Sequence, residues 1–149
     1  MSFDKCELVV LSPGDGEIVE FMGSMVAHKV RAHQTGHRWA FSETREAPGA
    51  GPALHLHHDE PEAFYVLEGE YTFLTVDREE TLLPGASVFV PPGVLHGFRA
   101  GPEGGRLLCV LPAGFDGFFF AVKEALDSGL AVPEVFRSIG ESFNMSRAR

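Results

Sequence analysis

The sequence predicts an all-β domain of many short strands, followed by a short helical segment. The main observation is that short apolar runs alternate with turn-prone residues at even spacing between residues 53 and 111, a pattern typical of a β-sandwich or barrel. The 149-residue chain also has 17 Gly and 10 Pro, more than a helical bundle tolerates. A chain of this length suits one hydrophobic core, so we expect a single domain over residues 1–149.

The expected strands follow one another along the chain. Residues 25–30 and 38–41 form two strand-like runs, and residues 47–52, rich in Gly and Pro, predict a loop. The later strands are expected at residues 53–57, 63–67, 71–76, 81–83, 87–90, 96–99 and 106–111, with turns that include residues 68–70 and 101–102. The predicted barrel core therefore covers about residues 25–112.

Two short helices are expected in a C-terminal segment over about residues 114–142. Apolar residues recur at helical spacing within residues 115–126 and again within residues 133–142. We expect their apolar faces to pack on the outside of the barrel or, as a second choice, on a partner subunit. From residue 144 onward the chain is expected to fray.

Charge and composition exclude several classes of partner. The net charge of -9, with no basic stripe, repels phosphate backbones, so no nucleic acid partner is expected. No apolar run reaches the roughly 20 residues that cross a bilayer, and the first residues lack a secretory pattern. We therefore expect no membrane partner and a cytoplasmic location. Cys6 and Cys109 lie far apart without a CxxC spacing, which predicts reduced thiols.

Three histidines and one glutamate form a candidate metal site. His55 and His57 project from the same face of a strand, while Leu56 points away. Glu62 begins the next strand after a turn, and His96 follows a Pro-Pro-Gly turn. Imidazole nitrogens with one carboxylate suit Fe, Mn, Ni, Co or Zn, and four ligands in an octahedron leave two positions open.

The same residues carry a resemblance to a known superfamily. Residues 49–69 resemble the first cupin motif and residues 85–96 resemble the second, with the four candidate ligands at the metal-binding positions. The resemblance implies the cupin double-stranded β-helix, a jelly-roll barrel, with one divalent metal ion. Residues 64–70 and 112–115 are similar to the quercetinase-like branch of small single-domain cupins, the monocupins. Ala100 departs from the second motif, which commonly has Asn there, but that position is not a ligand.

The metal-facing side of the strands predicts the substrate pocket. Side chains alternate along a strand, so Phe64 and Val66 lie on the same side as Glu62. In the same way Phe98 lies on the same side as His96. No Lys or Arg falls on that face of these two strands, which favours an apolar, aromatic or polycyclic small molecule over a sugar phosphate. Lys29 and Arg31 lie on a strand whose register stays open, and they could still supply a cation.

The remaining chemistry-bearing residues are expected to be structural. The other four histidines are expected at the surface or at the pocket rim: His28, His33, His37 and His58. His58 stands next to the ligand pair but on the opposite face of its strand. The aromatic run at residues 118–120 is expected to pack against the barrel or a partner subunit rather than to bind substrate. Three glycines are expected to serve tight turns: Gly69, Gly85 and Gly93.

Three functions stay open. The favoured one is a quercetinase-like dioxygenase acting on an aromatic, polyphenolic or polyketide-like substrate. In it Glu62 is both a ligand and the catalytic proton acceptor, a role that requires a raised carboxyl pKa. The alternatives are a non-redox, zinc-type polyketide cyclase or isomerase and a non-catalytic small-molecule-binding cupin. A homodimer is expected from the apolar helix faces and the exposed strands.

Overall fold

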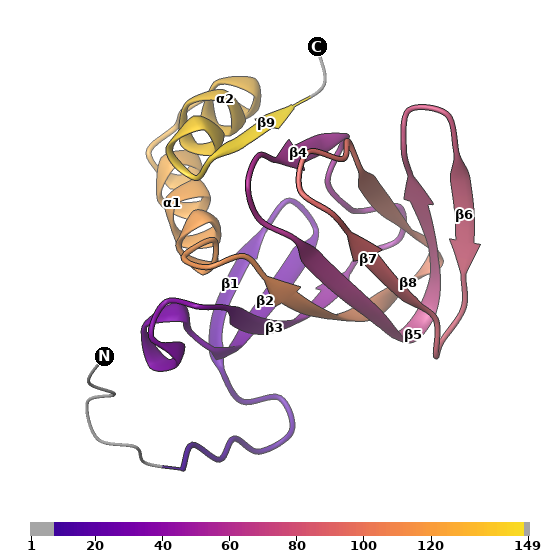
Figure 1. The fold of residues 1–149 in the computed structure, drawn as a ribbon, viewed down its shortest axis with the longest axis horizontal. Coiled ribbons are helices and arrows are strands. Elements are labelled where there is room, and N and C mark those ends of the chain that lie inside the picture. The colour runs from indigo at the N-terminus through magenta and orange to yellow at the C-terminus, as the bar shows by residue number, and fades with distance from the viewer. Residues whose placement is uncertain (1–7, 148–149) are drawn as a thin grey trace.

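The computed structural model describes residues 8–147 and confirms the predicted β architecture (Figure 1). Within these residues a seven-stranded sheet has the order β1-β2-β3-β8-β5-β6, and β7 pairs with β5. A separate two-stranded sheet joins β4 to β9, and every pairing is antiparallel. The strands are β1 (Glu17–Phe21), β2 (Ser24–Val30), β3 (Ala40–Glu46), β4 (His55–His57), β5 (Glu62–Leu74), β6 (Glu79–Leu82), β7 (Ser87–Val90), β8 (Gly97–Leu111) and β9 (Met145–Arg147).

Two of the expected turns lie inside long strands. Residues 68–70 belong to β5 and residues 101–102 belong to β8, so four expected strands merge into two. The β5–β8 pairing shifts register on both sides of this region of β5. Gly69 has φ 77°, and a Cβ there would lie 2.3 Å from the carbonyl oxygen of Gly104. The glycine therefore allows close approach within an irregular ladder, where the sequence had suggested that the chain turns back.

The helical segment was predicted in the right place but not with the right packing. It consists of α1 (Asp116–Asp127) and α2 (Val132–Ser142), and a short 3₁₀ turn, η1 (Ala32–Thr35), lies earlier in the chain. Figure 1 shows both helices together at one end of the sheet, beside β9. Apolar side chains of both helices line an internal cavity, so the expectation that they pack on the outside of the barrel is wrong. Within residues 8–147 no helix is both long and apolar enough to cross a membrane.

Residues 145–147 form a strand, which corrects the fraying expected from residue 144 onward for the part of the tail that the structure describes. The register of β9 on β4 pairs Met145 with His57 and Arg147 with His55. Asn144 turns the chain from α2 into β9 at φ 55°, a left-handed conformation that Asn tolerates better than most residues. Met145 is buried, at 5% exposure. Burial of Met145 and backbone pairing with β4 thus stabilise residues 145–147 as a strand. Their short sequence has no pattern that predicts one.

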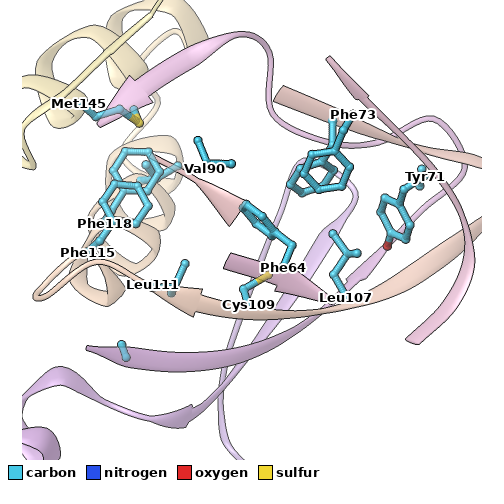
Figure 2. Close-up of a cluster of buried hydrophobic side chains, with 14 of the residues drawn as sticks. Phe64, Tyr71, Phe73, Val90, Leu107, Cys109, Leu111, Phe115, Phe118 and Met145 are labelled. Atoms are coloured by element: carbon cyan, nitrogen blue, oxygen red, sulfur yellow. The ribbon is translucent and has the colours of Figure 1, made fainter. Parts of the chain in front are cut away.

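The core lies on the inner faces of the long strands. Figure 2 shows Phe64 and Phe73 together in the interior, and their ring centroids are 5.3 Å apart. Phe98 packs against both, at 5.7 Å from Phe64 and 5.2 Å from Phe73. Such aromatic pairs contribute about 0.5–1.5 kcal/mol each beyond their buried area. This cluster fixes the inner face of β5, the strand that begins with Glu62.

The loop at residues 47–52 runs along the start of β8. The Ala100 amide donates to the carbonyl of Ala50 at 2.8 Å, and the Phe98 amide donates to that of Pro52 at 3.3 Å. Gly51 lies between these bonds at φ 152°, and a Cβ there would stand 2.1 Å from the Phe98 carbonyl oxygen. Only glycine lets the two backbones come so close.

We expect Gly51→Ala to lower the free energy of unfolding by about 3 kcal/mol or more, because strain and overlap with backbone add. Gly49→Ala is the matched control, since Gly49 has φ 73° but no atom within 4 Å of a new Cβ. It should cost only about 1–2 kcal/mol. Urea unfolding of both variants measures the difference, and equal losses would contradict the close approach.

A row of apolar residues crosses the outer face of the sheet. Phe89 pairs with Ala63, Ala63 with Val110, and Val110 with Phe41. Phe89 is 67% exposed and Val110 39% exposed. Contiguous exposed apolar surface is typical of interaction sites. The homodimer stays a prediction, and this row of residues is a candidate for its interface.

If the row forms the dimer contact, Phe89→Glu should convert a dimer into a monomer, because it would bury a charge without a partner at the interface. Val76→Glu is the control, since Val76 is 74% exposed but lies outside the row. Light scattering at micromolar concentration measures the mass of each variant. A monomeric wild type would refute the dimer itself.

Candidate metal centre

The four residues expected to bind metal lie together. Each of His55, His57, Glu62 and His96 offers one ligand atom, and these atoms all lie within 4.8 Å of one another. All four residues are buried, with exposures of 8% or less. This is the arrangement that the motif spacing predicted.

Backbone hydrogen bonds hold the two motif segments against each other. The His55 amide donates to the His96 carbonyl at 2.9 Å, and the His96 amide donates back to the His55 carbonyl at 2.8 Å. The Gly93 amide, in the Pro-Pro-Gly turn, donates to the His57 carbonyl at 2.7 Å. Three of the candidate ligands therefore lie on backbone that is fixed by hydrogen bonds, and the fourth, Glu62, is the first residue of β5.

Two imidazole rings are oriented by backbone carbonyls. The distance from His55 Nδ1 to the Ala53 carbonyl oxygen is 2.9 Å, and that from His96 Nδ1 to the Val94 carbonyl oxygen is also 2.9 Å. A carbonyl can only accept, so each Nδ1 carries the hydrogen and each neutral ring presents the lone pair of Nε2. This is the arrangement that fixes the tautomer of a metal-binding histidine.

The donor atoms fit a cation. His96 Nε2 lies 2.9 Å from Glu62 Oε2, and His57 Nε2 lies 3.2 Å from the same oxygen. Among the described residues His57 Nε2 is buried without a hydrogen bond of normal geometry. Lone pairs that converge on a carboxylate oxygen repel one another unless a positive charge lies among them. A divalent metal ion supplies that charge without requiring protonated imidazoles.

The protonation states suit ligands. Burial alone would raise the pKa of Glu62, but the close contacts with His57 and His96 outweigh it and lower the pKa to about 2. Burial, followed by the charge of His96, lowers the pKa of His55 to about 4. At neutral pH the carboxylate is ionised and the imidazole is neutral. The proton-acceptor role of Glu62 called for a raised pKa, and the protein's own groups shift it the other way.

The cluster opens into a cavity of about 260 Å³, which His55 and Glu62 both line. Phe64 and Phe98 are part of its wall, whereas Val66 is buried in the core at 1% exposure and does not line it. The volume lies just below the roughly 300–1,000 Å³ of ligand-binding pockets. It suits a compact ligand of a few rings.

The C-terminal segment supplies wall residues that the sequence reasoning missed. Phe118 and Phe119 line the cavity, contrary to the expectation for the run at residues 118–120. Phe120 instead stacks on His28, with ring centroids 5.1 Å apart, beneath the Arg31 guanidinium. Helical spacing identified the apolar face but could not show that it would cover a cavity.

The cation in the cavity wall was also unforeseen. Arg147, from β9, lines the cavity. The two candidates from the sequence are engaged elsewhere: Lys29 donates to the Asp15 carbonyl, and Arg31 pairs with Glu17 and Asp116. Glu46, at the end of β3, is a further unforeseen wall residue. Its side chain points inward because side chains alternate along β3. The sequence predicted that this strand ends at residue 41 and therefore did not include Glu46.

The remaining histidines lie outside the ligand cluster. His33 and His37 are exposed as expected, and His58 donates to or accepts from Ser146 Oγ at 2.7 Å on the other face of its strand. His28 is buried at 2% exposure, with Nδ1 2.9 Å from Ser42 Oγ, so its expected surface position is wrong. Cys109 is a buried free thiol, whereas Cys6 lies outside the described residues.

Comparison with known proteins agrees with the fold and the motif. Residues 42–111 match the family model of the cupin domain. Residues 42–111 thus form a cupin domain. No curated protein matches it. The comparisons do not single out the quercetinase-like branch, which stays a prediction.

Solved structures share this cupin's fold at low sequence identity. An RmlC-like cupin from Shewanella frigidimarina is 27% identical, with a TM-score of 0.62 over 74% of this chain and 96% of that one. The polyketide cyclase RemF from Streptomyces resistomycificus is 24% identical, with a TM-score of 0.63 over 71% and 80%. A predicted oxalate decarboxylase from Thermotoga maritima is 23% identical, with a TM-score of 0.60 over 71% and 99%. The last two show the fold alone.

We expect His96→Ala to lower metal affinity by about 100-fold or more, because losing even a residue that only orients a ligand costs about 10–100-fold. Tag-free protein is measured by elemental analysis after reconstitution and dialysis. The control is His33→Ala, an exposed histidine outside the cluster, which should keep full occupancy. Full occupancy in a folded His96→Ala variant would remove His96 from the ligand set.

Proposed function

We propose that this cupin is a metal-dependent enzyme that acts on a small aromatic substrate, and that within this class it is a dioxygenase. The observation that carries the proposal is that His55 and Glu62, members of the candidate ligand set, line a cavity that is otherwise largely apolar and rich in phenylalanine. A ligand bound there contacts the site and the aromatic wall together.

In the proposal, His55, His57, Glu62 and His96 hold one divalent ion. His55 and Glu62 line the cavity, so an ion held by the four side chains would be accessible to a substrate bound there. When bound, a redox-capable ion such as Fe, Mn, Ni or Co supplies a route for electrons between a substrate oxygen and dioxygen.

The aromatic side chains bind and orient the substrate. Phe64 and Phe98 meet edge to face in the wall beside the ligands. Phe115 and Phe118, stacked at 4.7 Å between ring centroids, cover the cavity from the helical segment. Flat rings fit against such walls, and the apolar cover excludes water from the reacting atoms.

Glu62 is proposed to handle the substrate proton. Its contacts with His57 and His96 both use Oε2, which leaves Oε1 for a substrate hydroxyl. A carboxylate with a low pKa is a weak base, so the transfer suits only an acidic hydroxyl, such as an enol or phenol held beside the ligands.

A second candidate is a non-redox cyclase or isomerase, with an ion such as zinc polarising a substrate carbonyl. The observation that favours it is the lowered pKa of Glu62. Burial alone would raise this pKa, but His57 and His96 lower it by more. A carboxylate kept ionised in this way is better suited to act as a permanent ligand than as a base. A cupin that only binds small molecules would use the same cavity without turnover.

We expect tag-free protein to carry close to one redox-capable metal per chain and to consume oxygen with a flavonol or a related polyphenol. Elemental analysis and an oxygen electrode measure the two quantities, with His96→Ala as the metal-depleted control. Product formation without oxygen, on protein that holds zinc, would replace the dioxygenase by the cyclase or isomerase. No metal after reconstitution would overturn both enzymes.

A further inference from the structure

A second carboxyl group lies in the wall of the cavity. Glu46, the last residue of β3, is 7% exposed and lines the same cavity as His55 and Glu62. It ends a series of inward-facing residues on β3 that includes Ser42 and Thr44, which also line the cavity. One wall of an otherwise aromatic cavity is therefore polar.

Glu46 is held by a hydroxyl and not by a cation. Ser24 Oγ donates to Glu46 Oε2, and no ion pair among the described residues includes Glu46. Burial raises the pKa of Glu46, whereas the hydroxyls of Ser24 and Thr44 lower it. Thr44 is 5% exposed, and its Oγ1 has no hydrogen bond of normal geometry among the residues described. The wall thus has hydrogen-bonding capacity that the protein does not use fully.

A buried carboxyl without a cation destabilises a fold. Transfer of such a group from water is costly unless it is paired, and an apolar residue of similar size is often at least as stable at such a position. Perturbed buried carboxyls accordingly cluster at functional sites. The position of Glu46 makes sense if a ligand completes its hydrogen bonds.

Glu46 and the ligand cluster lie at opposite ends of the cavity wall. Along β8, Glu46 is level with Gly105, while Ala63, next to Glu62, is level with Val110. Five residues of strand separate the two levels, roughly 17 Å along the strand. Cys109 lies between them: burial and then the charges of Glu62 and Glu46 raise the pKa of its thiol. Figure 2 shows Cys109 beside Phe64.

We propose that Glu46, with Thr44, is the specificity-determining group of the cavity and binds a hydroxyl on the substrate's aromatic ring farthest from the ligand cluster. This inference rests on the proposed aromatic substrate but not on the reaction type. A phenolic hydroxyl donates to the carboxyl and accepts from Thr44, which satisfies both side chains. A methyl ether cannot donate, and an anionic group at that end is repelled by an ionised carboxyl.

The test compares two probes, 3-hydroxyflavone and 3,4′-dihydroxyflavone, which differ only by a hydroxyl on the distal ring. Each is titrated anaerobically into the metal-loaded protein and followed by fluorescence. Wild type should bind the dihydroxy probe about 10-fold more tightly, the effect of one hydrogen bond to a carboxyl. Glu46→Leu should abolish this preference, while Glu46→Gln should reduce it at least about 3-fold.

The matched control is Glu43→Gln. Glu43 lies on the same strand but pairs with Arg106 rather than lining the cavity, so the preference should be unchanged. Thermal unfolding separates binding from a structural role: a ligand-binding carboxyl can be replaced by Leu without lowering Tm. A structural carboxyl gives a lower Tm with the preference intact, and that result overturns the inference.

Two other outcomes also overturn it. One is equal binding of both probes by wild type, and the other is binding of neither probe. In either case the proposed function is tested independently, by the metal content and the oxygen uptake of wild type. If Glu46→Leu fails to fold, the Glu46→Gln comparison decides, because the amide has the same shape as the carboxyl.

Discussion

The paired backbone hydrogen bonds between His55 and His96 join the two halves of the candidate metal centre. One residue comes from β4 and the other precedes β8, forty-one positions later in the chain, yet each amide donates to the other's carbonyl at 2.8–2.9 Å. The neighbouring contacts extend this pairing: Gly51 and the loop around it run along the first residues of β8. Side-chain geometry at the site therefore depends on main-chain pairing, which is less variable than rotamers of long side chains.

The aromatic cavity follows from how the C-terminal segment is attached. Because β9 pairs with β4, the helices before it are drawn across the end of the sheet, and Phe118 and Phe136 turn inward. The ring of Phe115 contacts that of His57, with centroids 4.5 Å apart, so the cover and the ligand cluster are in direct contact. The aromatic cover therefore touches the ligand cluster, and His55 and Glu62 of that cluster line the cavity.

The sequence was informative where local rules decide geometry. The two histidines of β4 share a face because strands alternate, and the position of Glu62 follows from the turn before it. It was uninformative where long-range contacts decide. The three residues of β9 have no alternating pattern, and only pairing with a strand some ninety residues earlier makes them a strand. The sequence made no prediction for Glu46, because a polar inner wall cannot be told from a polar surface without the fold.

The pairing of Arg147 with His55 places a cavity-wall cation and a candidate metal ligand on neighbouring backbone. A change in the length of the connection between α2 and β9 would therefore alter two properties together: how firmly the ligand strand is held, and which charge meets the substrate at the cavity wall. In the proposed function, substrate preference and metal retention would therefore both depend on one short strand. Evolution of a new specificity through the C-terminal segment would have to preserve that strand's register.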